Sequence, residues 1–588
     1  MGFGPDSRLG DVMDSPSGRD ILSRHMTNIP MWDAMELQAR YFRIRQLLQV
    51  LERTAGPMTQ DHQDLLYAEL ASAGDAAVHE PDYQSIGQPD GVYTAEPSGV
   101  ANAAFEHQRS TPRWNIQEVT LLGPDQGNPF TEVELFGEFT CEGRTQTVRG
   151  FYDGGGRYLL RFMPDTVGRW TFQTRSNVPS LSELTGNFEC AAAPAGSHGP
   201  VRVHETFHFE HADGTRYSPV GTTAYAWTHQ NQELEDLTLQ TMKTSGFNKL
   251  RMCAFPKWYD FNTDEPPRYP FEGSPVAGWD YSRPNPEFFQ HLERRIADLG
   301  SIGVQADLIL FHPYDKWGFS DMGPQADVFY VRYLIARLAS FSNVWWSLAN
   351  EYDLLASKTL DEWRRIGEII EAEDPYGHPR SIHNWMAYYD NSQSWVTHAS
   401  IQKIEPYLTA ERTTEFRQRW HKPVIIDECG YEGDIEWNWG NLSGREMVRR
   451  FWEGALRGGY VGHGETYLES NDIIWWSRGG MLHGESSPRI AFLRTILDNA
   501  GGHLEPLFPL NDHPWASAGT NCYLAYLGFM QPRALSYTLP SDRWYTVDVI
   551  DTWNMTTNRL NGTFQGAVKV DLPAHSFMAV RFLAVEQE

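Results

Sequence analysis

The sequence predicts an α/β protein built on a (β/α)8 TIM barrel, flanked by an N-terminal β-sandwich and a C-terminal β domain, with a small N-terminal helical module. Three observations predict it. The 588 residues exceed what a single hydrophobic core supports. Eight strand-like segments alternate with helix-like ones between residues 200 and 503, as a (β/α)8 barrel requires. Short alternating segments, broken by Gly, Asn and Asp, lie before and after that region.

The first 75 residues have helical periodicity. The stretch "MELQARYFRIRQLLQVLERT" places five apolar residues on one helical face: Leu37, Tyr41, Ile44, Leu48 and Leu51. Such a stripe serves either to dock a module on its own chain, which is the commoner case, or to form a homo-oligomer. Residues 76–110 are rich in Gly, Pro, Asp and Ser without periodicity and are predicted to be a linker.

Residues 111–193 change to period-two alternation in "TEVELFGEFT", "TQTVRGFYDG" and "RYLLRFMPDTVGRWTFQTRS", which predicts the β-sandwich. In the barrel region, 200–503, the predicted strands are 218–225, 247–253, 304–311, 344–351, 380–385, 396–402, 422–429 and 459–465. Residues 504–588 return to strand patterning in "NCYLAYLGF" and "WYTVDVIDTW", which predicts the C-terminal β domain.

Composition excludes several classes of protein. With 49 Lys+Arg against 76 Asp+Glu, the net charge of −27 repels phosphate backbones, so nucleic acid is not an expected partner. No run of about 18 apolar residues could span a membrane. The 21 Trp and 26 Tyr suit sugar faces, although cores use them too. Five scattered cysteines and the absence of a basic start with an apolar core are typical of a cytoplasmic chain.

Two glutamates end predicted strands of the barrel. Glu351 closes the fourth strand in "NVWWSLANE", and Glu428 closes the seventh in "KPVIIDE". Catalytic groups of such barrels lie at the carboxyl ends of the strands. Period-two alternation puts Val424, Ile426 and Glu428 on one face, which we expect to be inward, and Asp427 on the other.

Two carboxyl groups that face each other are the minimal equipment for glycoside hydrolysis, because one protonates the leaving oxygen while the other attacks or activates water. Acids at strand ends also serve as helix caps or ion-pair partners, and for either glutamate alone that role is about equally expected.

The Asn350-Glu351 ending of strand four together with Glu428 ending strand seven resembles the clan A glycoside hydrolases, retaining enzymes with a (β/α)8 barrel. Within that clan the chain looks most like the apiosidase-like and related glycoside hydrolases, which carry a β-sandwich before the barrel and a small β domain after it. The matching pieces are "YSPVGTTAYAW", "GFNKLRM", "LANE", "GYVGHGETY" and "WWSRGGMLHGESSPR". The helical module lies outside the resemblance.

The resemblance implies a role for each matching residue. Glu351 would be the general acid/base and Glu428 the nucleophile. Asn350 would donate to the sugar hydroxyl beside the anomeric carbon, and Arg251 would keep Glu428 ionised by lowering its pKa. Retention would place the two carboxyl groups about 5–5.5 Å apart. It also requires a raised pKa for Glu351, through burial near "VWW", and a lowered one for Glu428.

Strand-end His and Trp residues in such barrels commonly contact sugar. The candidates for substrate binding are therefore His312, His383, His398, Tyr431, Trp475 and Trp476, with Trp227 and Trp258 as stacking walls. A lone His is more often a satisfied core residue, and either wall Trp can equally pack on the sandwich.

No metal or cofactor is expected. Metal-dependent barrels of the amidohydrolase type need an H-x-H on the first strand, and "GTTAYAWTH" lacks it. The eighth strand holds "GHGE", with His463 and Glu465 two positions apart, a poor metal pair without further ligands.

The sequence thus predicts a cytoplasmic retaining glycoside hydrolase whose partner is a carbohydrate, a small glycoside or oligosaccharide. The alternative function is a non-catalytic carbohydrate-binding protein that uses the barrel as a scaffold.

Overall fold

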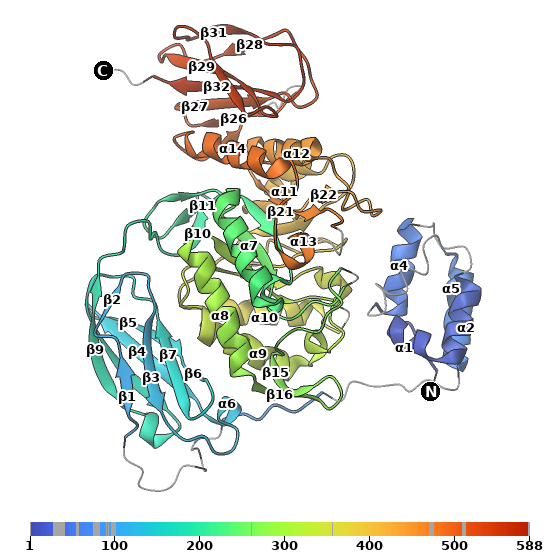
Figure 1. The fold of residues 1–588 in the computed structure, drawn as a ribbon, viewed down its shortest axis with the longest axis vertical. Helices are drawn as coiled ribbons and strands as arrows, with labels where there is room; N and C mark the ends of the chain where they lie inside the picture. Colours follow the sequence, from blue (N-terminus) through green and yellow to red (C-terminus); the bar gives the residue numbers. More distant parts are fainter. Residues whose placement is uncertain are drawn as a thin grey trace.

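The computed structural model describes residues 2–26, 42–54, 58–73, 83–89, 91, 93, 95, 102–259, 261–355, 357–469, 475–508 and 513–585. It confirms the predicted fold class, a (β/α)8 barrel with additional β-sheets on either side in the sequence. Figure 1 shows the sandwich in cyan at the lower left, the C-terminal sheets in red at the top and the helical module in blue at the right.

The barrel sheet has eight parallel strands in the order β19-β18-β17-β14-β13-β23-β21-β20. A parallel bridge between His383 and Ser400 joins its two edges. Each strand falls within a segment predicted as a strand: β13 (Gly221–Thr223), β14 (Lys249–Cys253), β17 (Gln305–Phe311), β18 (Val344–Ala349), β19 (Arg380–Ser381), β20 (Ala399–Gln402), β21 (Val424–Glu428) and β23 (Tyr460–His463).

Helices cover the outside of the barrel: α7 (Gln232–Ser245), α8 (Pro286–Ser301), α9 (Pro324–Leu338), α10 (Leu360–Glu373), α11 (Thr413–Trp420), α12 (Gly444–Leu456) and α14 (Ser486–Asp498). The four-residue helix α13 (Trp475–Arg478) instead accepts backbone hydrogen bonds from residues 225 and 226, which follow β13. Residues 382–398, between β19 and β20, form no helix. The loops of the barrel contain two pairs of short strands. β15 (Phe271–Ser274) pairs with β16 (Gly278–Pro284), and β22 (Glu432–Gly433) pairs with β24 (Glu465–Thr466).

A small antiparallel sheet covers the amino-terminal end of the barrel. It consists of β10 (Val201–His204), β11 (His208–His211) and β12 (Arg216–Tyr217). Phe209 lies 5.0 Å from Trp345 and 5.7 Å from Tyr460, measured between ring centroids. Trp345 and Tyr460 stand at the starts of their strands, so β11 closes this end and leaves the carboxyl ends of the strands for chemistry.

The sandwich has two sheets around a core of aromatic rings that includes Phe139 and Phe162, stacked 4.3 Å apart. Its strands are β1 (Phe105–His107), β3 (Gln117–Leu122), β7 (Arg157–Phe162) and β6 (Phe151–Tyr152) in one sheet, and β2 (Ser110–Pro112), β9 (Thr185–Ala191), β8 (Gly168–Ser176), β4 (Leu135–Cys141) and β5 (Arg144–Arg149) in the other. A single helical turn, α6 (Pro129–Glu132), precedes β4.

The C-terminal region contains one sheet of six strands and one of two. The six are β25 (Glu505–Pro506), β26 (Trp515–Ala518), β27 (Cys522–Tyr526), β32 (Met578–Ala584), β29 (Tyr545–Asp551) and β30 (Thr556–Arg559), and the two are β28 (Ala534–Thr538) and β31 (Ala567–Asp571).

The N-terminal module contains α1 (Leu9–Asp14), α2 (Pro16–His25), α4 (Ile44–Thr54) and α5 (Gln60–Ser72). Of the predicted apolar stripe, Ile44, Leu48 and Leu51 are buried in the module's own core, whereas Leu37 and Tyr41 lie outside the described residues, as does most of the predicted linker. The module contacts the barrel through polar groups and through Phe42, whose ring centroid lies 6.3 Å from that of Trp385.

Polar contacts of Arg8 and Gln46 join the module to loops at the carboxyl end of the barrel. Arg8 forms an ion pair with Asp321, which follows β17. The Gln46 side chain donates to the carbonyl oxygen of Leu354, which follows β18, over 2.9 Å.

The described part of the chain contains no helix long and apolar enough to cross a membrane.

Candidate active site

Glu351 and Glu428 come from the carboxyl ends of β18 and β21, which β19 and β20 separate on one side of the ring. Glu351 follows β18 with φ +50° and ψ 54°, a left-handed conformation that costs a non-glycine residue about 1–2 kcal/mol. This turn ends the strand and aims the carboxyl group away from it. Glu428 is the last residue of β21, and its charge is close enough to raise the pKa of Glu351. Both residues are nearly buried, with 5% and 7% of their surface exposed.

The two carboxyl groups have opposite electrostatic surroundings. Burial and the charge of Glu428 raise the pKa of Glu351 to about 8, against the hydrogen bond that the Tyr314 hydroxyl donates to it. Burial also disfavours the charge of Glu428, but His383 and the hydroxyl of Tyr225 outweigh it and lower the pKa of Glu428 to about 2. At neutral pH one group is protonated and the other ionised, as an acid and a nucleophile require.

A chain of polar groups backs Glu428. His383 Nε2 lies 3.2 Å from Glu428 Oε1, and its Nδ1 lies 3.0 Å from Ser400 Oγ. The Ser400 hydroxyl donates to Asp427 over 2.6 Å, and Lys249 donates to the same carboxylate over 2.8 Å. Because Ser400 gives its proton to Asp427, its oxygen is left to accept from His383 Nδ1–H.

The predicted face of Asp427 is wrong. Asp427 lies inside the barrel, where Lys249 of β14 reaches it. The pairing of β20 with β21 passes from Ser400–Ile425 to Gln402–Glu428, so β21 has one extra residue there. Such a bulge interrupts the alternation, and both Asp427 and Glu428 reach the interior, Glu428 at its rim.

Arg251 acts on Glu428 less directly than predicted. Its guanidinium donates to Asn350 Oδ1 over 3.1 Å and to Ser347 over 3.1 Å, and pairs with Asp307 at 3.4 Å. Its charge contributes to the low pKa of Glu428 after His383 and Tyr225. Arg251 contacts Asn350 directly and orients its side chain. Because Asn350 Oδ1 accepts from Arg251, the Asn350 amino group faces away from Arg251.

Two of the other predicted sugar contacts reach the site. Tyr431 lies with its hydroxyl 3.5 Å from that of Tyr225. The Trp476 ring lies 6.0 Å from the Tyr431 ring and 5.8 Å from the Tyr225 ring. Trp258, partly buried, donates its backbone N–H to the carbonyl oxygen of Tyr314 and so lies beside the site.

Four predicted contacts do not line the site. His398 precedes β20 and packs against Phe209 and Trp345 at the closed end of the barrel. His312 is buried with Nε2 3.3 Å from the carbonyl oxygen of Phe255. In both, burial lowers the pKa, to about 4 and about 3, so each is a neutral core residue.

The remaining two are tryptophans. Trp227 is fully buried in the core and donates to Met252 Sδ, so it forms no stacking wall. Trp475 is turned into the barrel wall and donates to Thr222 Oγ1 over 2.9 Å.

Sequence reasoning missed three residues of the site. Tyr225 and Tyr314 hold the two acids by hydrogen bonds. The Lys257 ammonium lies 3.8 Å from the centroid of the Tyr225 ring and 4.4 Å from that of Tyr314, and burial lowers its pKa. The signal for the tyrosines is their place, since each follows a barrel strand closely.

Comparison with known proteins agrees with this architecture. The model of the apiosidase-like catalytic domain matches residues 204–515, and two domains of unknown function, DUF5060 and DUF5605, match residues 110–177 and 511–583. None of the curated proteins matches the chain.

Among solved structures, a protein from Bacteroides vulgatus ATCC 8482 assigned to the glycoside hydrolases is 39% identical, with a TM-score of 0.77, over 81% of this chain and 100% of its own. A family 5 glycoside hydrolase from the same organism shares the fold alone, at 13% identity and a TM-score of 0.52 over 66% of this chain and 94% of its own. The chain therefore belongs to the family of apiosidase-like catalytic domains and is a glycoside hydrolase.

Proposed function

We propose that this glycoside hydrolase is a retaining enzyme in which Glu428 is the nucleophile and Glu351 the general acid/base. The observation that supports this most is the opposite surroundings of the two carboxyl groups. Glu351 is buried with a like charge nearby, which favours its protonated form, whereas Glu428 accepts from Tyr225 beside His383, which favours its ionised form. An acid and a nucleophile are thus ready together at neutral pH.

In the first step, Glu351 gives its proton to the leaving oxygen while Glu428 attacks the anomeric carbon and forms a glycosyl ester. Esterification removes the negative charge of Glu428, and with it one cause of the high pKa of Glu351. In the second step Glu351 takes a proton from water, the water oxygen attacks the anomeric carbon, and Glu428 leaves as a carboxylate.

His383 supports the assignment of Glu428 as the ionised partner. Its Nδ1–H donates to Ser400, so its contact with the carboxylate of Glu428 becomes attractive when Nε2 also carries a proton. The ester of the intermediate is neutral and gains less from this charge. A proton on Nε2 would therefore favour return of Glu428 to its ionised form in the second step.

The substrate we propose is a small glycoside or oligosaccharide. The small exposed fractions of Glu351 and Glu428 fit a ligand that enters a confined site better than a polymer that lies along a surface. The amino group of Asn350 is placed to donate to a sugar hydroxyl, and Tyr431 and Trp476 offer aromatic faces.

A screen of aryl glycosides, with NMR of the first anomer released, tests the proposal. Retention of configuration by the parent and loss of turnover in Glu428→Ala are expected. Inversion would overturn the mechanism. Failure of the folded parent to turn over any glycoside would overturn the proposed catalysis and favour a non-catalytic carbohydrate-binding protein.

A further inference from the structure

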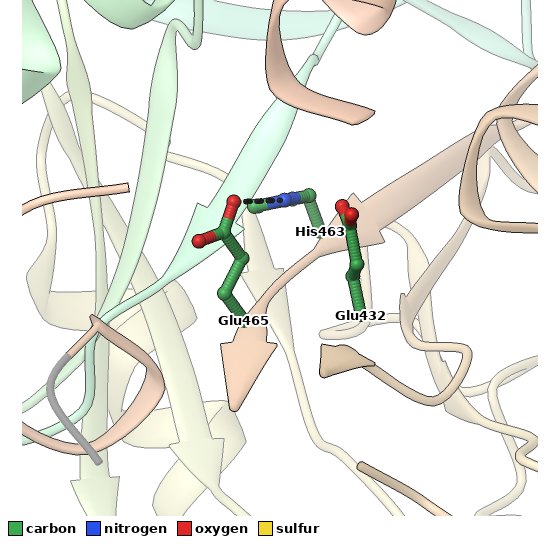
Figure 2. A group of neighbouring side chains, drawn as sticks. All are labelled: Glu432, His463 and Glu465. Carbon is green, nitrogen blue, oxygen red and sulfur yellow. Dashed lines mark ion pairs between the residues drawn. The ribbon is translucent and has the colours of Figure 1, made fainter. Parts of the chain in front are cut away.

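Three buried side chains converge behind the active site, on β22, β23 and β24. Glu432 of β22 and Glu465 of β24 are register partners in a parallel pair, and His463 ends β23 two residues before Glu465. One potential ligand atom from each lies within 4.8 Å of the others. Figure 2 shows the side chains of His463 and Glu465 meeting, with Glu432 beside the imidazole. In the fold, Glu432 therefore joins His463 and Glu465 of "GHGE" as a third potential metal ligand.

Burial makes this arrangement costly unless a positive charge is supplied. Glu432, His463 and Glu465 are at most 1% exposed. Like charges on register partners repel, and water is too scarce here to screen them. Within the described ranges, the one ion-pair partner of either carboxylate is His463, whose Nε2 lies 3.6 Å from Glu465 Oε1. No lysine or arginine in those ranges pairs with them.

The hydrogen bonds engage both oxygens of Glu432 but only one oxygen of Glu465. The Tyr467 hydroxyl and the N–H groups of Glu485 and Ser486, where α14 begins, donate to Glu432. The N–H of His483 donates to Glu465 Oε2. By contrast, Glu465 Oε1 and His463 Nε2 have no hydrogen-bond partner in the described part of the chain, and their separation of 3.6 Å is too long for one.

Gly484 leaves room between the two carboxylates. A Cβ atom at this position would lie 2.5 Å from Glu432 Oε2 and 2.5 Å from Glu465 Oε1. Both oxygens are therefore adjacent to the same point, and any side chain at position 484 would collide with them. The glycine therefore lets an oxygen of each acid approach the other with no side chain between them.

The other imidazole nitrogen is held as in metal-binding histidines. His463 Nδ1 lies 2.8 Å from Thr222 Oγ1, which also accepts from Trp475. When Nδ1–H donates to Thr222, the lone pair of Nε2 faces the carboxylates, which is the tautomer a metal needs. In the alternative arrangement the proton of His463 is on Nε2 and faces the Glu465 carboxylate, so that no ion is needed.

We propose that Glu432, His463 and Glu465 bind a divalent cation, Zn²⁺ or Mn²⁺. One imidazole with two carboxylates suits these ions, whereas Ca²⁺ and Mg²⁺ prefer oxygen alone. Two ligands about 2.1 Å from an ion stand at most about 4.2 Å apart, so small side-chain movements close the site. The ion would tie the segments after the seventh and eighth strands together.

The position of the site predicts a structural role. Tyr431, next to Glu432, contacts Tyr225 at the active site, and Trp475 reaches His463 through Thr222. No potential ligand of the ion holds Glu351 or Glu428. The ion would therefore support the walls of the active site and stabilise the fold without taking part in the reaction.

Metal analysis of the full chain tests the proposal. Protein treated with EDTA and freed of chelator is titrated with ZnCl₂ or MnCl₂, with CaCl₂ and MgCl₂ for comparison. We expect one equivalent of Zn²⁺ or Mn²⁺ to bind and to raise the unfolding temperature. Absence of stoichiometric Zn²⁺ and Mn²⁺ binding would overturn the proposal in favour of the arrangement with a proton on Nε2.

Glu465→Gln removes one ligand with almost no change in shape. Metal affinity is expected to fall more than about 100-fold, because even partners outside the ligand set are worth 10- to 100-fold. The control is Glu469→Gln, whose carboxylate pairs with His483 at a partly exposed position. It should bind metal as the parent does. Equal affinity in Glu465→Gln and Glu469→Gln would overturn the proposal.

X-ray absorption at the metal edge of the loaded parent needs no variant and covers the case in which Glu465→Gln does not fold. One imidazole nitrogen with oxygen ligands at about 2.0–2.2 Å is expected. Sulfur ligation, or more than one imidazole, would place the ion elsewhere and overturn the assignment. None of these outcomes depends on the retaining mechanism.

Discussion

Two pairs of buried glutamates lie close together in this fold, and their surroundings differ. Glu351 and Glu428 come from strands four and seven, and each has its own hydrogen-bond donor, Tyr314 for one and Tyr225 for the other. Glu432 and Glu465 are register partners in one pair of short strands, beside His463, which ends barrel strand β23.

The difference lies in how each pair avoids two adjacent negative charges. In the first pair the surroundings push the pKa values apart, to about 8 and about 2, so one acid holds a proton at neutral pH. A pair divided in this way can transfer that proton. In the second pair one oxygen of each carboxylate and one imidazole nitrogen of His463 lie within 4.8 Å of one another, and we propose that a cation is shared there.

Replacing one acid of each pair gives the largest expected contrast. Glu428→Gln should lower kcat/KM by a factor on the order of 10⁶, the scale seen when a covalent nucleophile is removed. Glu465→Gln should lower it less than about tenfold below its unfolding temperature, because it does not touch the reacting atoms. Rates on a reactive aryl glycoside measure both. Equal losses in two folded variants would contradict the division of roles.

Glu351→Gln separates proton transfer from attack. Turnover of glycosides with poor leaving groups should fall about 10²–10⁴-fold, the usual value of general acid catalysis. Formation of the glycosyl-enzyme from a dinitrophenyl glycoside should fall much less, because that leaving group needs no proton. Pre-steady-state release of dinitrophenolate measures this step. An equal loss on both substrates would show that Glu351 does not act as the acid.

His383→Gln should move the acidic limb of the pH profile. The nucleophile is active above its pKa, and His383 is the main group that lowers the pKa of Glu428 to about 2. Without that charge the limb should rise by about 1–3 pH units. The control is His398→Gln, at the closed end of the barrel, which should leave the limb in place. The pH dependence of kcat/KM measures both variants, and identical acidic limbs would exclude this role of His383.

Tyr314→Phe should have the smallest effect on activity, and this effect should fall on the alkaline limb of the pH profile. The acid is active below its pKa, so activity should decline above about pH 8 in the parent. The Tyr314 hydroxyl stabilises the ionised form of Glu351, so its loss should move the alkaline limb to higher pH. The matched Tyr225→Phe variant should instead raise the acidic limb. An alkaline limb that moves down in Tyr314→Phe would contradict this view of Glu351.

Much of the fold could be predicted from the sequence, because strand and helix periodicity are local. All eight barrel strands fall within predicted segments, and the order Asn350-Glu351 and Glu428 marked two strand ends that meet in one site. The wrong inward face of β21 has a non-local cause, because its bulge depends on the pairing with β20. Likewise His398 resembles a strand-end ligand until β11 is seen to cover it.

The sequence by itself determined the alternation of strands and helices, the three flanking regions and the two strand-end acids, since these depend on spacing along one chain. Only the tertiary structure decided which donors hold each acid and that Glu432 joins His463 and Glu465. The donors to the acids and the grouping of Glu432 with His463 and Glu465 both depend on residues that are distant in sequence, or whose side chains are oriented by a bulge or by a pair of short strands. Electrostatic surroundings are set by such distances in space, and hydrophobic periodicity carries no information about them.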